Sequence, residues 1–89
     1  MIPDKNGWIK IEGEDTLPEK GIEVLIFEPN NPNEPEEGIK AVSYYEKTIK
    51  KEKYRGYIRD IYLFPDYQDE ISSYFYATHW QPLPENPII

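Results

Sequence analysis

The sequence predicts a small, mainly β protein, and three observations support this. Several short runs alternate large apolar and polar residues, which is typical of strands that bury one face. Nine prolines and five glycines divide the chain into such runs and the turns between them. No apolar stripe with helical spacing reaches the length of an ordinary helix. We therefore expect a five-stranded antiparallel barrel or roll, SH3-like as first choice, with at most one short helical turn. A single curled sheet with one short helix packed on it is the second choice.

The first two expected strands are residues 8–11 and 23–27. The first, Trp-Ile-Lys-Ile, alternates and follows a polar terminus over residues 1–7 that we expect to be loose. Pro18 and Gly21 indicate a sharp turn between the strands, because proline fixes its own φ and glycine accepts a positive φ. The second run, Glu-Val-Leu-Ile-Phe, is continuous and rich in branched residues, which favours a central and buried strand.

Three further runs complete the expected set of strands, at residues 39–46, 57–64 and 74–80. The proline-rich and asparagine-rich stretch 28–38 should form an exposed loop, because proline is excluded from helix and sheet interiors. The polar stretch 66–73 is also expected to be a loop.

Two more segments have a predicted role. The basic segment 47–55 contains few apolar residues and should form a hairpin tip. The tail 81–89 should be extended, with proline blocking pairing at a sheet edge. The expected core residues are Trp8, Leu17, Val24, Ile26, Trp80 and Leu83. We expect the two tryptophans to share one interior.

Composition limits the function classes. Eighty-nine residues make a single domain over residues 1–89, and eight Tyr, three Phe and two Trp supply the bulk of its core. The net charge of −7 makes binding to double-stranded nucleic acid unlikely, because such binding needs a basic face. The absence of cysteine excludes disulfides and thiolate metal sites. No stretch has the length of a membrane span, and none resembles a signal peptide, so we expect a cytoplasmic protein.

Two blocks near the ends of the chain resemble a known family. The first block is Trp8-Ile9, then Leu17-Pro18-Glu19-Lys20-Gly21, then Val24-Leu25-Ile26; the second is Thr78-His79-Trp80-Gln81-Pro82-Leu83-Pro84. In order and spacing they resemble the DUF551 family, a small domain of unknown function common in phages and prophages. Gln81 stands where that family usually has Met. The resemblance implies a phage or prophage accessory protein and no particular reaction.

The residues themselves indicate no catalytic centre, metal site or cofactor. His79 is the only histidine, and it lies in the last expected strand, where a structural imidazole is the simplest interpretation. A contact of His79 with a ligand is the alternative. One histidine without cysteine does not make an ordinary zinc site, and the acidic runs do not match a calcium loop.

The leading hypothesis is a non-enzymatic module that binds a host or phage protein. The alternative is a small-ligand or nucleotide-binding protein, with tyrosines stacking a base beside the basic hairpin. A homo-oligomer is a further expectation. The candidate binding residues are Tyr44, Tyr57, Tyr62, Tyr76, His79, Lys50, Lys51, Lys53 and Arg55.

Overall fold

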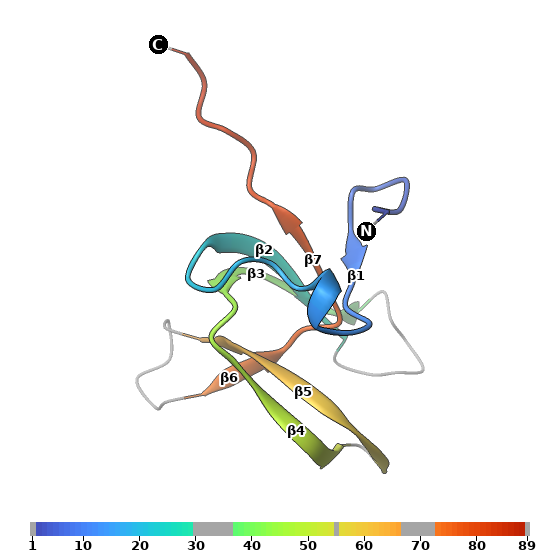
Figure 1. Cartoon of the computed structure of the whole chain (residues 1–89). Helices are drawn as coiled ribbons and strands as arrows, with labels where there is room; N and C mark the ends of the chain where they lie inside the picture. The colour runs from blue at the N-terminus through green and yellow to red at the C-terminus, as the bar shows by residue number, and fades with distance from the viewer. Residues whose placement is uncertain (1, 30–36, 55, 67–72, 89) are drawn as a thin grey trace.

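In the residues that it describes, the computed structural model contains two antiparallel sheets and a short 3-10 helix, η1 (Figure 1). It describes residues 2–29, 37–54, 56–66 and 73–88. The first sheet has the order β1-β7-β2-β3, and the second has the order β4-β5-β6. The elements are β1 (Ile9–Lys10), η1 (Glu14–Thr16), β2 (Glu23–Glu28), β3 (Ile39–Tyr44), β4 (Lys47–Tyr54), β5 (Tyr57–Pro65), β6 (Tyr74–Tyr76) and β7 (His79–Pro82).

The prediction of a mainly β protein is confirmed, whereas the described strands do not form a closed SH3-like barrel. The expected strand 74–80 divides into β6 and β7, because the chain crosses from the second sheet to the first at Ala77 and Thr78. A second crossing, at Tyr45 and Glu46, shortens the expected strand 39–46 to β3. Tyr45 and Ala77 are both buried, so the two crossings contribute to the core.

The basic segment 47–55 is a strand and not a hairpin tip. Its residues up to Tyr54 form β4, which pairs with β5 along most of its length. Lysine side chains are compatible with an edge strand, because the long polar side chains remain in water there. A bulge between Ile49 and Glu52 places Lys51 at φ 56°. Of the expected loop 66–73, residues 67–72 lie outside the described part of the chain.

The core lies between the two sheets. The inner face of the first sheet contributes one row across all four strands, set by the pairs Ile9–Trp80, Trp80–Ile26 and Ile26–Ala41. Phe64 of β5 packs into the same cluster from the second sheet and is fully buried. The Trp80 indole Nε1–H donates to the Thr16 carbonyl at 2.7 Å, so the last strand also fixes η1.

The two tryptophans do not share an interior, which corrects the expectation. Ile9 faces inward opposite Trp80, so the side chain of Trp8, one residue earlier, lies on the outer face of the sheet. There it packs on Phe27 with ring centroids 6.0 Å apart. The prediction that Leu83 belongs to the core is also wrong, because this residue is 37% exposed. Leu17, in contrast, packs against the core cluster.

The hydroxyl of a buried serine joins the two sheets. Ser43 of β3 has no exposed surface, and its Oγ donates to the Pro65 carbonyl of β5 at 2.6 Å. The Glu46 N–H donates to the Leu63 carbonyl at 3.0 Å. The Ser43 bond therefore joins strands of different sheets, whereas the Glu46 bond extends the pairing of β4 with β5.

The N-terminal segment is a hydrogen-bonded turn and not the loose end we expected. The Asp4 N–H donates to the Trp8 carbonyl at 2.8 Å, and the Asp4 Oδ1 accepts from the N–H groups of Asn6 and Trp8. Gly7 closes the turn at φ 89°. Met1 lies outside the described residues.

The boundaries of the expected loop 28–38 also change. Glu28 belongs to β2, and its Oε2 accepts from the Tyr76 N–H of β6. Gly38 lies against the ring of Phe27 so closely that a Cβ there would be 2.2 Å from two ring carbons. The middle of the loop, residues 30–36, is not among the described residues.

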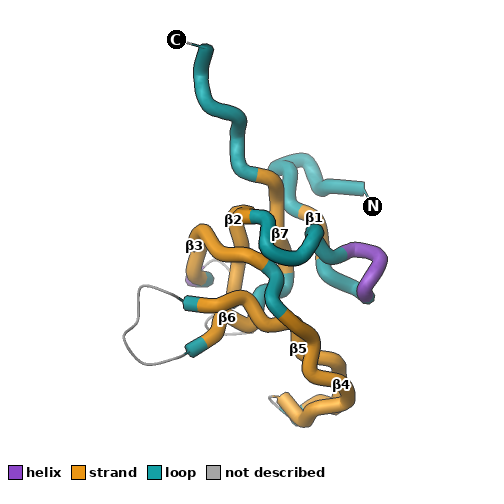
Figure 2. Tube along the Cα trace, turned by 60° about the vertical axis from the view of Figure 1, so that its left-hand side comes forward, coloured by secondary structure: helices purple, strands orange, loops and turns teal. Residues whose placement is uncertain are grey.

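The molecule has a projection at each end of its long axis. The segment after β7 leads upward away from both sheets in Figures 1 and 2, and its residues 82–88 are exposed. The β4–β5 hairpin extends from the opposite end. Within the described ranges, no helix is long and apolar enough to cross a bilayer.

Candidate functional site

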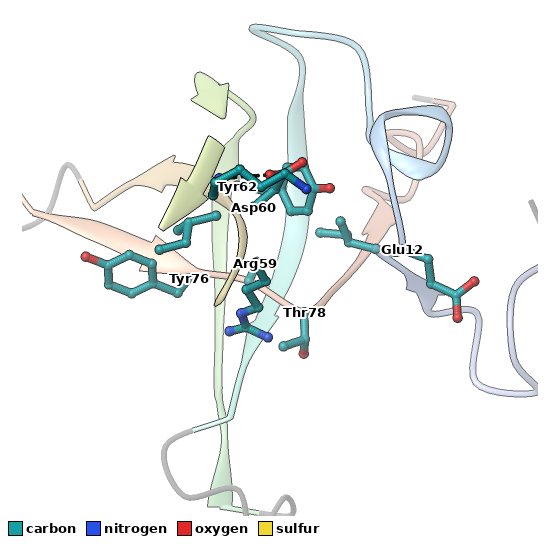
Figure 3. Close-up of a pocket in the computed structure, with 10 residues that line it drawn as sticks. Glu12, Arg59, Asp60, Tyr62, Tyr76 and Thr78 are labelled. Carbon is teal, nitrogen blue, oxygen red and sulfur yellow. Dashed lines mark hydrogen bonds between the residues drawn. The ribbon is translucent and has the colours of Figure 1, made fainter. Parts of the chain in front are cut away.

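A groove of about 280 Å³ lies where the β4–β5 hairpin meets the first sheet (Figure 3). Its lining combines apolar side chains with polar ones that include charges of both signs. The lining residues come from the strand after β1, from β4 and β5, and from the β6–β7 crossing: Ile11, Glu12, Lys51, Arg59, Asp60, Ile61, Tyr62, Tyr76, Ala77 and Thr78.

Thr78 holds the groove in place because its backbone joins three segments. Its N–H donates to the Phe27 carbonyl at 2.9 Å, and its carbonyl accepts from the Ile11 N–H at 2.9 Å. In Figure 3 the side chains of Thr78 and Arg59 extend toward the same opening, whereas the Glu12 carboxylate points away. The groove is therefore formed by backbone pairing between segments that are far apart in the sequence.

Asp60 organises the β4 bulge at one wall of the groove. Its Oδ1 accepts from the Lys51 N–H at 3.0 Å, which satisfies a donor that the bulge removes from the strand ladder. This bond, together with the nearby Lys50 ammonium at 3.7 Å, holds the pKa of the Asp60 carboxyl below its usual value. The carboxylate form therefore fixes the backbone that carries the Lys51 side chain.

Acid should weaken the fold through Asp60. The pKa of Asp60 is lower in the folded protein than in the unfolded chain, where it is near 3.8. The carboxylate therefore stabilises the fold fully at pH values above 3.8, and this stabilisation is lost as the pH falls through the pKa of the folded protein. Urea unfolding between pH 6 and pH 2.5 should show this loss in the wild type and a smaller loss in Asp60→Asn, which keeps an Oδ1 acceptor. Identical pH dependence in both proteins would contradict this role.

Burial raises the pKa of the Tyr62 phenol above its usual value, and the Asp60 carboxylate acts in the same direction, so the hydroxyl stays protonated at neutral pH like that of an ordinary tyrosine. Tyr62 can thus donate or accept a hydrogen bond in the groove at neutral pH. With Tyr76, it gives the groove two aromatic side chains beside the cations of Lys51 and Arg59.

The structure divides the predicted binding residues among several places. Tyr62, Tyr76 and Lys51 meet in the groove. The Lys50 ammonium instead bonds Glu14, a bond that raises its pKa. Lys53 and Tyr57 lie near the end of the hairpin, and Tyr44 lies in β3. Arg55 is outside the described residues.

Sequence reasoning missed four polar groove residues: Glu12, Arg59, Asp60 and Thr78. Arg59 and Asp60 interrupt an otherwise apolar strand, and this interruption was a usable signal for a polar wall. Glu12 and Thr78 reach the groove only through the pairing of distant segments, which no local pattern indicates.

His79 lies on the outer face of the first sheet and not among the groove-lining residues. Its pKa is lowered, chiefly by burial, so the imidazole is neutral at pH 7. Its Nδ1 lies 2.8 Å from the Thr78 hydroxyl, and its ring meets Phe27 edge-on at 6.1 Å. These two contacts give the ring a defined orientation.

The described residues do not bring together a group of three or more His, Asp or Glu side chains that could hold a metal ion. The groove can supply hydrogen bonds, charge and ring faces to a bound molecule. This chemistry suits recognition.

Comparison with known proteins identifies a family. Residues 7–88 match the family model described as "Protein of unknown function (DUF551)". Neither curated proteins nor solved structures give a match. The match extends from the N-terminal turn through every strand into the exposed tail, and so spans most of the chain. The chain therefore belongs to the DUF551 family.

Proposed function

We propose that this protein is a non-enzymatic accessory protein of phage or prophage type that acts by binding another protein through its β4–β5 hairpin. One observation carries the proposal: Tyr57 and Ile58, on opposite faces of β5 near the end of the hairpin, are 74% and 75% exposed. Large apolar side chains exposed together on a defined backbone are typical of contact surfaces between proteins.

The hairpin is well placed for such a contact. Among the described residues, Leu63, Phe64 and Pro65 of β5 pair with β6, and the outer part of β5 pairs with β4. The hairpin extends past the core in both views (Figures 1 and 2). The end of the hairpin can therefore enter a concave surface of a partner protein, while the rest of the two sheets stays clear of that partner.

Charge favours an acidic partner surface. Lys51, Lys53 and Arg59 are all exposed on the hairpin of a protein whose net charge is −7. The rest of the molecule repels an acidic partner, so attraction is strongest at the hairpin. Association should consequently be directed toward this end and should slow as salt is added.

Photo-cross-linking tests the hairpin. With p-benzoylphenylalanine in place of Tyr57, the protein should cross-link one partner in lysate of a bacterium that carries its gene. With the same group in place of Glu85, in the tail at the other end of the molecule, the protein should not cross-link that partner. The double variant Tyr57→Ala/Ile58→Ala should bind the purified partner at least about tenfold more weakly, with an unchanged melting temperature.

The matched control is Lys5→Ala, an exposed residue in the N-terminal turn, which should bind the partner normally. Cross-linking that is equal from positions 57 and 85, or full affinity in the double variant, would disprove the role of the hairpin.

The groove favours a second candidate, the binding of a small ligand such as a nucleotide. Tyr62 and Tyr76 could stack on a planar base, and Lys51 and Arg59 could attract phosphate. A thermal-shift panel of nucleotides, repeated on Tyr62→Leu, tests this candidate. A shift in melting temperature that Tyr62→Leu abolishes supports it, and no shift at millimolar concentrations contradicts it.

A further inference from the structure

The outer face of the first sheet has an aromatic cup, separate from the groove. The cup has a volume of about 180 Å³ and is lined by Asp4, Trp8, Phe27, Lys40 and His79. It shares none of its lining residues with the groove, and it lies on a different sheet from the outer part of the hairpin.

Strand register builds the wall of the cup. His79 of β7 is paired with Phe27 of β2, which is in turn paired with Lys40 of β3. Directly opposed residues place their side chains on the same face of a sheet. Trp8 completes the wall from the residue before β1, with its ring at 58° to that of Phe27. The register thus places three rings around one space.

The N-terminal turn supplies a carboxylate. Asp4 Oδ1 accepts from the N–H groups of Asn6 at 2.9 Å and Trp8 at 3.0 Å, so the same turn fixes both the carboxylate and the indole. A negative charge and aromatic faces attract the same kind of ligand, because the face of a ring is its electron-rich part. The neutral imidazole of His79 adds a third ring without a positive charge.

The cup is better suited to a methylated ammonium than to a strongly hydrated cation. Its walls are mainly rings, and they offer few acceptors to replace lost water molecules. A quaternary ammonium carries no N–H group and loses little hydration, and aromatic cages bind such groups. An anion would face the Asp4 carboxylate, although the Lys40 ammonium at the same space would attract it.

We propose that the Trp8–Phe27–His79 cup, with the Asp4 carboxylate, binds a methylated ammonium group. The group belongs to a small molecule such as choline or to a trimethylated lysine side chain, since both present the same chemistry. This site is independent of the proposed contact through the hairpin.

The two tryptophans provide the measurement. In a ¹⁵N–¹H spectrum, titration with choline should move the indole signal of Trp8 and leave that of Trp80, which lies on the other face, unchanged. The neutral isostere 3,3-dimethylbutan-1-ol should bind roughly tenfold more weakly, because it lacks the charge that the rings and Asp4 attract. A trimethyl-lysine peptide and its unmodified form identify the source of the group: tighter binding than choline indicates a protein partner, and weaker binding a small molecule.

Three variants separate this site from a merely structural cluster. Asp4→Asn keeps the Oδ1 acceptor of the turn, removes the charge and should weaken choline binding severalfold. Lys40→Gln removes a competing ammonium and should strengthen it. Lys47→Gln, on β4 of the second sheet and outside the cup, should leave it unchanged.

Three results would overturn the proposal: equal affinity for choline and its neutral isostere, a Trp8 signal that does not move at about 100 mM choline, or wild-type affinity in Asp4→Asn. Loss of partner binding in the hairpin double variant together with retained choline binding would show that the two sites act separately.

Discussion

Trp80→Ala should lower the melting temperature more than the other substitutions considered. The Trp80 side chain is 7% exposed, faces the inner row of the first sheet, and donates its indole N–H to Thr16. Removal of a buried tryptophan costs about 3–5 kcal/mol. A chain of 89 residues has a free energy of unfolding of about 4–13 kcal/mol, so the loss removes between about a quarter and all of its stability. Thermal unfolding followed by circular dichroism should show a midpoint lower by at least about 12 °C.

Trp8→Ala is the matched control, since it removes the same side chain from the outer face. It should cost roughly 1–2 kcal/mol, because Trp8 is only partly buried. Equal destabilisation by the two substitutions would mean that both indoles belong to one core, contrary to the strand register.

Ser43→Val should be the second most damaging of the substitutions considered. The side chain has no exposed surface, so the added carbon atoms overfill its site. The substitution also removes the donor to the Pro65 carbonyl. Together these effects should lower the free energy of unfolding, measured with urea, by about 2–5 kcal/mol. Ser43→Ala, which removes only the hydroxyl, should cost about 1–3 kcal/mol.

Val42→Thr, the neighbouring position, provides the control for Ser43. Its side chain is 38% exposed on the outer face, so the change should stay within about 0.5 kcal/mol. If Ser43→Val were as mild as Val42→Thr, the bond between β3 and β5 would not hold the two sheets together.

The local alternation of residues predicted most strands but not their assembly. The strand predicted at residues 23–27 is present as part of β2, because a continuous run of branched apolar residues strongly favours a buried strand. The run 74–80 also alternates, yet it serves two sheets. Alternation continues unchanged through Ala77 and Thr78, because a crossing strand can keep its pleat while it changes partners. Only the pairing of Ile9 with Trp80 and of Tyr76 with Leu63 shows the change of sheet.

The candidate site was less predictable than the strands. The sequence indicated tyrosines beside basic residues, and Tyr62, Tyr76 and Lys51 do lie together. The sequence does not indicate that Lys51 lines the groove while Lys50, one residue earlier, bonds to Glu14 instead. That bond connects residues 36 positions apart, and such contacts depend on the fold as a whole.

The position of the last strand affects how the protein is made. β7 lies between β1 and β2, so the first sheet lacks its second strand until residues 79–82 have been synthesised. The second sheet is encoded entirely between β3 and β7 and can pair earlier. On the ribosome, β2 can pair with β3 early, whereas β1 and the other edge of β2 must wait for β7 and remain accessible to chaperones during that time.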